Sequence, residues 1–585
     1  MRASRAELIA LMLSTCAKRV EEADGEVSEA IDFVEFYTRQ AIEFESLEGL
    51  ELESRGVAFI APPWNFPLAI ALGSLLGALL TGHSVLFKPA AQAGAIGYKI
   101  CQFLWQSGVS QEVLQFLCLD EDSVGKKLLQ DPRLDLVALT GSTQTAKLFL
   151  ESAPSRPLIA ETGGKNTLII SNTCDRDQAI KDLIHSAFSH SGQKCSSASL
   201  ALVHEEIYKD PKFWQQLLDG TQSLKVGSAW DLQSKVTPLA LSDQPKLLWA
   251  LQELETGQEW VLKPKQDEAN PRLWSPGIVK GVRKGQRRHL EEFFGPILGV
   301  MPYKKLSEAI EIANQTSYGL TAGLHTLSEE EESFWKSNIL AGNLYVNRPI
   351  TGAIVLRQPF GGTKASRIGQ GRKAGGPHYL LAFYRASSSS KAQGPQIRYP
   401  EKLSQLLSYS PPHLSSTLES IFKSYSYWYL HFTREIDPVQ IPGQNNLYFL
   451  QSQEDYLIRW QGEAGSELDF WCALAAGALC QEKIRVSAPY WPSKINPPAF
   501  IDYYQEADDW ALHWQNRALQ SVRFVGKPSS ENLKQLASRS ATALLDPVCY
   551  HGRCEVLYPL REVSFCRDYH RYGNLGLQPS LAPLK

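Results

Sequence analysis

The chain has little of several features that would mark a specialised class of protein. Only 21% of its 585 residues are charged, and a net charge of −3 gives neither sign a clear excess. This balance offers no electrostatic reason to expect binding to nucleic acid or to an anionic membrane. The longest apolar run, residues 68–80, contains glycines and is too short to span a bilayer comfortably. With no visible signal peptide, we expect a cytoplasmic protein without an integral membrane segment.

The sequence also lacks paired cysteines and the usual dinucleotide fingerprint. Its ten cysteines are scattered without regular pairing, which fits free thiols in a reducing compartment better than a disulfide framework. Cys549, His551 and Cys554 could be imagined as metal ligands, but no fourth ligand stands nearby, so we expect no metal site. A Gly-x-Gly-x-x-Gly run is absent.

The first part of the chain alternates short apolar segments with longer helical ones. Such alternation indicates βαβ units and a buried parallel sheet, which binds ligands at the carboxyl ends of its strands. Strands are expected at residues 57–60, 84–87, 113–117 and 136–139, with helices at 68–80, 95–106, 143–151 and from residue 123.

A second α/β block follows, and the composition changes near residue 387. The run SSSSKAQGP at residues 387–395 is typical of a polar linker, and a region rich in Trp and Tyr lies beyond it. In that region we expect a helix at residues 470–479 and a strand at 483–487. The predicted fold class is α/β, with a Rossmann-type parallel-sheet domain and a second α/β domain followed by a further one. The predicted divisions are residues 1–161, 162–362, 363–399 (a return segment and linker) and 400–585.

Two short runs together indicate covalent chemistry. Cys195 lies in GQKCSS at residues 192–197, where small neighbours leave a thiol accessible, and Glu161 begins ETGGK at residues 161–165. The double glycine leaves the carboxylate room to swing. In covalent catalysis a cysteine can attack the substrate, and a carboxylate can then activate the water that releases the product. The two runs therefore indicate an enzyme with a covalent intermediate. The alternative for Cys195 is an inert buried thiol.

Two polar residues follow predicted strands. Asn65, in PWNFP at residues 63–67, could donate its amide to a developing oxyanion, or it could simply cap the next helix. Lys88 ends a buried strand, where it could reach cofactor hydroxyls or remain solvated.

Two further runs fit a cofactor site. Gly141 and Ser142 join a strand to a helix, a position whose free amides suit phosphate, although a plain helix cap would look the same. Glu292 and Phe294, in EFFGP at residues 292–296, could hold a ribose or a nicotinamide ring, or could form a bare turn.

Taken in order, these runs resemble the aldehyde dehydrogenase superfamily. PWNFP, KP, TGST, ETGGK, GQKC, EFFGP and the PFGG at residues 359–362 occur in the order of that family, over roughly residues 1–385. Ser196, the TGAIV run at 351–355 and the KAGGP run at 373–377 are similar to L-glutamate γ-semialdehyde (1-pyrroline-5-carboxylate) dehydrogenases. They resemble in particular the dehydrogenase half of the bacterial bifunctional proline-utilisation proteins (PutA). The region after residue 400 resembles the extra non-catalytic domain of the longer forms, and residues 561–576 resemble their C-terminal motif.

The resemblance implies NAD-dependent oxidation of the semialdehyde to L-glutamate in proline catabolism. Cys195 would attack the aldehyde, Asn65 and the Cys195 backbone N–H would bind the oxyanion, and Glu161 would activate water. No metal is needed. NAD would be held in the domain at residues 1–161, and the residues implied in its binding are Trp64, Lys88, Gly141, Ser142, Glu292 and Phe294. Ser196, Gly352 and Ala353 would bind the substrate carboxylate, since successive amides in a glycine-containing loop form an anion-binding concavity.

The chain also departs from the family pattern. It begins inside what resembles a helix of the cofactor domain, Ala91 replaces an acid, and LDEDS at residues 119–123 replaces a glycine-containing loop. No flavin-binding barrel precedes the dehydrogenase. A second hypothesis is therefore a degenerate structural subunit, from a split protein, that docks with a separate proline dehydrogenase and has weak or no activity. In either case we expect a homo-oligomer.

Overall fold

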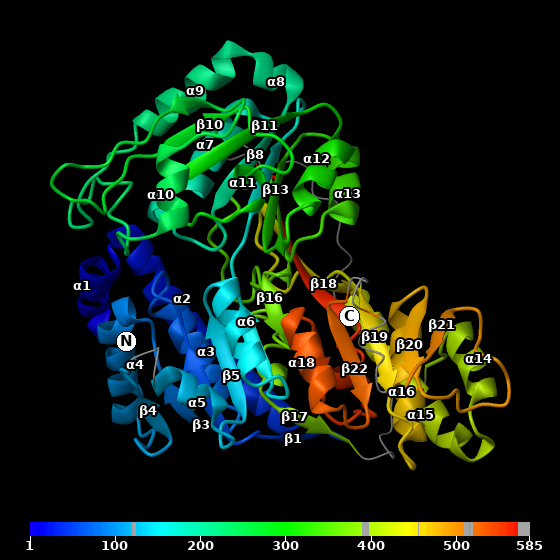
Figure 1. Cartoon of the computed structure of the whole chain (residues 1–585). Coiled ribbons are helices and arrows are strands. Elements are labelled where there is room, and N and C mark those ends of the chain that lie inside the picture. Colours follow the sequence, from blue (N-terminus) through cyan, green and yellow to red (C-terminus); the bar gives the residue numbers. More distant parts are fainter. Residues whose placement is uncertain (120–123, 389–396, 454, 508–513, 515–518, 571–585) are drawn as a thin grey trace.

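The computed structural model describes the chain except residues 120–123, 389–396, 454, 508–513, 515–518 and 571–585 (Figure 1). Three sheets of five or more strands organise these described residues. The predicted LDEDS loop falls largely outside the described residues, as do most of the predicted linker and the end of the C-terminal motif.

A six-stranded sheet forms the first α/β unit. Its strands pair in parallel except β16, which runs antiparallel to β6 at one edge. In spatial order they are β16 (Arg367–Gly369), β6 (Leu158–Glu161), β5 (Leu136–Thr140), β2 (Val57–Ala61), β3 (Ser84–Phe87) and β4 (Leu114–Phe116). The accompanying helices are α1 (Arg5–Cys16), α2 (Val20–Glu45), α3 (Ala69–Leu79), α4 (Gly94–Gln106), α5 (Lys126–Gln130) and α6 (Thr143–Ser152). The predicted alternation and the α/β fold class are confirmed.

A nine-stranded sheet forms the second unit. In spatial order its strands are β18 (Gln444–Ser452), β24 (Leu560–Asp568), β14 (Asn343–Val346), β13 (Thr321–His325), β7 (Asn166–Ile170), β8 (Ala198–His204), β11 (Ile297–Tyr303), β10 (Gly277–Lys280) and β9 (Glu259–Leu262). Helices that pack with it include α7 (Arg176–Phe188), α9 (Pro211–Gln222), α12 (Leu306–Asn314) and α13 (Glu329–Asn338). Apolar clusters cover both faces, as a largely parallel sheet requires.

Two strands of this sheet come from the region after residue 400. β24 pairs in parallel with β14, with Asn343 opposite Ser564, and β18 pairs antiparallel along the whole length of β24. Val563 and Phe565 are buried in the apolar cluster on one face, and Cys566 is buried on the other. The division at residue 400 remains a prediction, but the nine-stranded sheet crosses it.

A five-stranded parallel sheet forms the third unit. Its order is β21 (Ile501–Gln505), β20 (Ile484–Ala488), β19 (Tyr456–Trp460), β22 (Ser521–Val525) and β23 (Thr542–Leu544). Helices α14 (Glu401–Tyr409), α15 (Ser415–Thr433), α16 (Glu467–Cys480) and α18 (Ser530–Ser538) accompany it. The helix and strand predicted at residues 470–479 and 483–487 appear as α16 and β20.

The third unit packs against the first. Helix α18 contacts α6 beside β16, and Figure 1 shows these elements next to each other. The buried guanidinium of Arg55 joins Asp546 at 2.6 Å across this junction. In the described part of the chain, no helix combines the length and apolar character needed to cross a membrane.

Candidate active site

Cys195 lies in a tightly shaped loop between α7 and β8. His190, Ser191 and Gly192, in the short helix η4 (Ser189–Gly192), all have positive φ, at 49°, 55° and 70°. A Cβ at Gly192 would lie 2.2 Å from the Gly295 carbonyl oxygen, so only glycine fits against the EFFGP turn there. The loop therefore holds Cys195 against the predicted cofactor turn.

Asn166 fixes the backbone on the other side of the cysteine. Its Nδ2 donates to the carbonyl of Cys195 at 2.6 Å and to that of Ser197 at 3.0 Å. Its Oδ1 accepts from the Thr321 N–H at 3.0 Å, which anchors the loop to β13. Sequence reasoning missed Asn166. Its place next to the ETGGK run was the available signal.

Asn65 reaches the same loop from the first unit. Its Nδ2 donates to the Gln193 carbonyl at 3.1 Å, and its own carbonyl accepts from Lys18 Nζ at 2.8 Å. The helix-cap alternative for Asn65 is not what the structure shows. The first amides of α3, those of Leu68 and Ala69, donate instead to Glu26 Oε1. An amide nitrogen carries two hydrogens, so Asn65 keeps one donor beyond its bond to Gln193.

Glu161 ends β6 and is poorly satisfied. Its Oε2 accepts only a long hydrogen bond, 3.4 Å, from the Gly362 N–H, and its Oε1 is buried without a partner. Burial raises the pKa of Glu161 to about 8, against the opposing influence of Arg367 and Lys373. A carboxyl group with such a pKa can take up or release a proton near neutral pH.

Lys373 supports the turn that faces Glu161. Its Nζ donates to Asn343 Oδ1 at 2.6 Å and to the Gly361 carbonyl at 2.7 Å. Burial lowers the pKa of Lys373 to about 7, while the nearby Glu562 carboxylate opposes that change. The sequence analysis used Lys373 only as part of the KAGGP run and did not predict this supporting role.

Glu292 lies against the ETGGK run. Its Oε1 accepts from the Gly164 N–H at 2.8 Å, and a Cβ at Gly163 would lie 2.0 Å from its Oε2. Burial raises the pKa of Glu292 to about 7. The bare-turn alternative therefore does not describe this carboxylate, which contacts the segment that carries Glu161.

The electrostatic surroundings keep the Cys195 thiol protonated at rest. Burial, together with the nearby Glu292 and Glu161 carboxylates, raises the pKa of Cys195 to about 12. Attack by this thiol therefore requires a proton acceptor, because the thiolate is the nucleophile.

The remaining predicted cofactor residues lie at strand ends of the six-stranded sheet or beside the cysteine loop. The rings of Trp64 and Phe294 meet edge to face, with centroids 5.8 Å apart. Ser142 is the N-cap of α6, where its Oγ accepts from the Thr145 N–H, and the Gly141 N–H donates to the Glu161 carbonyl. The half-buried Lys88 follows β3 directly. Ser142 is thus a helix cap, which was the alternative to a phosphate-binding role. The cap uses the Thr145 N–H, so the other first amides of α6 remain candidates for binding phosphate.

The predicted substrate residues differ in exposure. Ser196 is buried, and its carbonyl accepts from Thr321 Oγ1 at 3.3 Å. Gly352 is exposed with φ +82° and has no heavy atom within 4 Å of an added Cβ. Ala353 is half-buried, and the neighbouring Thr351 Oγ1 is buried without a hydrogen-bond partner.

These observations match a known family. The aldehyde dehydrogenase family matches residues 1–388. The chain belongs to the aldehyde dehydrogenase family. It is 34% identical to a 1-pyrroline-5-carboxylate dehydrogenase of Bacillus licheniformis over 414 residues, covering 67% of this chain and 79% of that one. The structure is similar to Proline Utilization A (PutA) from Corynebacterium freiburgense, with a TM-score of 0.86 at 32% identity, over 98% of this chain and 56% of that chain. It is also similar to a 1-pyrroline-5-carboxylate dehydrogenase from Thermus with bound NAD, with a TM-score of 0.62 at 32% identity, over 66% of this chain and 78% of that one.

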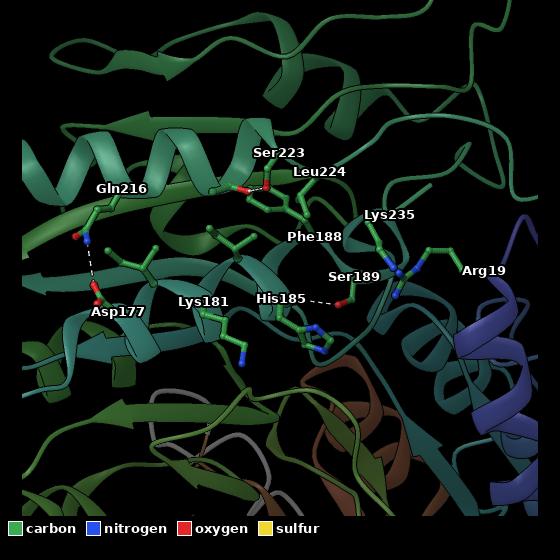
Figure 2. A pocket seen from close by; sticks show the side chains of 13 residues that line it. Arg19, Asp177, Lys181, His185, Phe188, Ser189, Gln216, Ser223, Leu224 and Lys235 are labelled. Atoms are coloured by element: carbon green, nitrogen blue, oxygen red, sulfur yellow. Dashed lines mark hydrogen bonds between the residues drawn. The ribbon is translucent and has the colours of Figure 1, made fainter. Parts of the chain in front are cut away.

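A cavity of about 440 Å³ lies between α7 and α9 of this aldehyde dehydrogenase (Figure 2). Its walls include Phe188 and Leu224, with the cations Arg19 and Lys235 at one end. None of the predicted site residues lines it. Glu22 connects it to the cysteine loop, since Glu22 pairs with Arg19 at 3.4 Å and with Lys194, next to Cys195, at 3.0 Å.

The cysteine–histidine grouping near the C-terminus has a structural use. His551 is the N-cap of α19 (Gly552–Glu555), where its Nδ1 accepts from the Arg553 N–H at 3.2 Å. Within the described residues, no group of three or more His, Cys, Asp or Glu side chains is arranged to hold a metal ion.

Proposed function

We propose that this aldehyde dehydrogenase oxidises L-glutamate γ-semialdehyde to L-glutamate with NAD, through a thioester on Cys195. The observation that carries the proposal is the convergence on the loop at residues 192–197. Asn65 hydrogen-bonds this loop from the first unit, and Asn166 anchors it to the second. The nearby Glu161 and Glu292 carboxylates help to raise the pKa of the Cys195 thiol.

The first step is attack of Cys195 on the aldehyde carbon. The thiol gives up its proton to a nearby carboxylate before it attacks, because the thiolate is the nucleophile. The Asn65 amide and the Cys195 backbone N–H bind the oxyanion of the thiohemiacetal. Losing one such donor typically lowers turnover by about 10²–10³-fold.

The second step releases the acid. Glu161, in its ionised form, removes a proton from a water molecule, which attacks the thioester and frees Cys195. Its unpartnered Oε1 can accept that hydrogen bond without breaking an existing one. Gly163 and Gly164 bring the segment that carries Glu161 close to the cysteine loop, since a Cβ at Gly164 would lie 2.7 Å from the Cys195 carbonyl oxygen.

The residues present fit NAD. Glu292 and Lys88 offer a carboxylate and an ammonium, which suit ribose hydroxyls, and the start of α6 offers amides for phosphate. When bound, NAD would supply the hydride acceptor that this oxidation needs. Gly141 and Ser142 would help to hold the phosphates, and Trp64 and Phe294 would limit access of water.

The substrate carboxylate would bind Ser196 and the amides of Gly352 and Ala353. The open space at Gly352 supports this assignment, because no heavy atom lies within 4 Å of a Cβ added there. By the same resemblance, we propose that a separate proline dehydrogenase supplies the substrate. The similarity to 56% of a PutA chain supports that partner.

Two measurements on the purified protein test the proposal. Titration with NAD should quench intrinsic tryptophan fluorescence, because Trp64 lies against Phe294, one of the proposed NAD-binding residues. Semialdehyde should then produce NADH at 340 nm. NAD binding without turnover would instead support the docking-subunit hypothesis, and failure of both would reject the enzyme assignment.

A further inference from the structure

A second polar cavity, of about 300 Å³, lies where the first unit meets the five-stranded sheet. One wall of the cavity is formed by α6 and by the segment around β16. It carries Lys147 on α6, and Lys364, Arg367 and Arg372 around β16. The opposite wall carries Arg539 and Ser540, which follow α18. The cavity lining thus includes five cationic side chains drawn from both sides of the junction.

Two of these cations are poorly compensated. Arg372 is 8% exposed, and its Nη1 makes a long contact of 3.5 Å to the Leu560 carbonyl. Arg367 makes contacts of 3.4 Å to the Gly371 carbonyl and 3.5 Å to Gln453 Oε1. Within the described residues, no carboxylate lies within ion-pair distance of either guanidinium. The Glu161 and Glu562 carboxylates act on Arg367 only from further away.

The cavity lining offers little negative charge in return. Asp455 is its acidic side chain, and its Oδ1 is already engaged by Arg485 at 3.3 Å. A buried charge without a counter-charge is costly, so the arrangement is short of an anion.

The cavity also holds polar groups suited to a ligand. Ser540, at φ 59°, has a buried Oγ without a hydrogen-bond partner. Gln453 is held in place because its Nε2 donates to Ser521 Oγ at 2.6 Å. An orphaned hydroxyl beside clustered guanidinium groups is typical of an oxyanion site, since guanidinium forks bind carboxylate and phosphate with paired hydrogen bonds.

We propose that this cavity is a binding site for a small multivalent oxyanion, one that carries phosphate groups or several carboxylates. The volume falls at the lower end of the range for small-molecule sites. Because the cations come from both walls, the bound anion would join the first unit to the five-stranded sheet and raise the melting temperature. The site is separate from Cys195, and the proposal does not depend on the oxidation chemistry.

The test uses the full chain and two probes, pyrophosphate and citrate, each against sodium chloride at equal ionic strength. Isothermal titration should show one site per chain, and scanning fluorimetry should show a rise in melting temperature that chloride does not reproduce. Whichever probe binds more tightly identifies phosphate or carboxylate as the preferred group.

Variants locate the site. Arg372→Gln and Arg539→Gln should each weaken binding about tenfold or more, because each removes a charge-assisted hydrogen bond. Arg133→Gln is the matched control, since Arg133 lies at the surface and pairs with Asp131 at 2.7 Å. Should Arg372→Gln fold poorly, Arg539→Gln and Lys147→Gln carry the test alone. Equal effects of the probes and chloride, or unchanged binding in the cavity variants, would overturn the proposal.

Discussion

The backbone N–H of Lys373 donates to Glu562 Oε2 at 2.8 Å, which joins β24 to the turn that supports Glu161. The same lysine holds Asn343 and Gly361 through its ammonium group. Glu562 also accepts from the Tyr448 hydroxyl on β18. The region after residue 400 therefore contributes to the support of the active site and is not only a cover over it.

Glu562→Ala should destabilise the protein. The change leaves the Lys373 N–H and the Tyr448 hydroxyl buried without an acceptor, and each unsatisfied group costs about 1–3 kcal/mol. Urea unfolding followed by tryptophan fluorescence measures the loss. Glu531→Ala, at an exposed position on α18, is the control and should change little. Equal midpoints for the two variants would contradict a structural role for Glu562.

Cys195→Ala should abolish aldehyde oxidation while leaving NAD binding nearly intact, because the thioester cannot form. Cys195→Ser should be almost as inactive, since a hydroxyl is a much weaker nucleophile than a thiolate. Steady-state assays with the semialdehyde, paired with NAD titration, separate the two effects. Retained turnover in the alanine variant would end the covalent mechanism.

Glu161 sets the expected pH dependence of product release. A general base works only when ionised, and the pKa of Glu161 is raised to about 8. Turnover limited by thioester hydrolysis should therefore rise as the pH increases through about 8 and decline below it. Rates measured from pH 6 to 10 test this direction.

Glu161→Gln should separate the two chemical steps. The variant should release about one equivalent of NADH per active site and then stall, because water is no longer activated. Stopped-flow absorbance at 340 nm records the burst. A variant without any burst would assign Glu161 to the attack of Cys195 or to a structural role.

Gly352→Val should erase much of the preference for the semialdehyde over an aliphatic aldehyde of similar length. An added Cβ at residue 352 meets open space, so a steric clash is not the cause of the expected loss. The cause is the positive φ, which orients the amides of this loop and which a β-branched residue rarely adopts. Gly285→Val is a matched control, with φ +84° and equally open surroundings outside the predicted site. The ratio of kcat/KM values measures the preference. A parallel drop in both variants would indicate general strain, not loss of a carboxylate site.

Local patterns in the sequence predicted much of the fold and indicated the residues of the candidate site. The strands at residues 57–61, 84–87 and 136–140 were found because buried parallel strands are short, apolar and bounded by helices. Cys195, Glu161 and Asn65 stood out because their neighbours are small or lie at strand ends.

The supporting contacts had no such local signal. Asn166, Lys373 and Glu562 act through partners far away in the chain, so their roles depend on the tertiary fold. The membership of β24 in the nine-stranded sheet was missed for the same reason. Its partner β14 lies more than 200 residues earlier, and a strand buried on both faces does not reveal which sheet contains it.

The position of β24 between β14 and β18 has a consequence for how the chain acquires its native state. Until residues 560–568 have emerged from the ribosome, β14 presents an unpaired apolar edge, which is a template for association with other chains. Pairing over such a sequence separation is slow because a long loop must close first. The segment that carries Cys195 is therefore translated early but joins a sheet that is completed late, and during that interval the nascent protein depends on protection from aggregation.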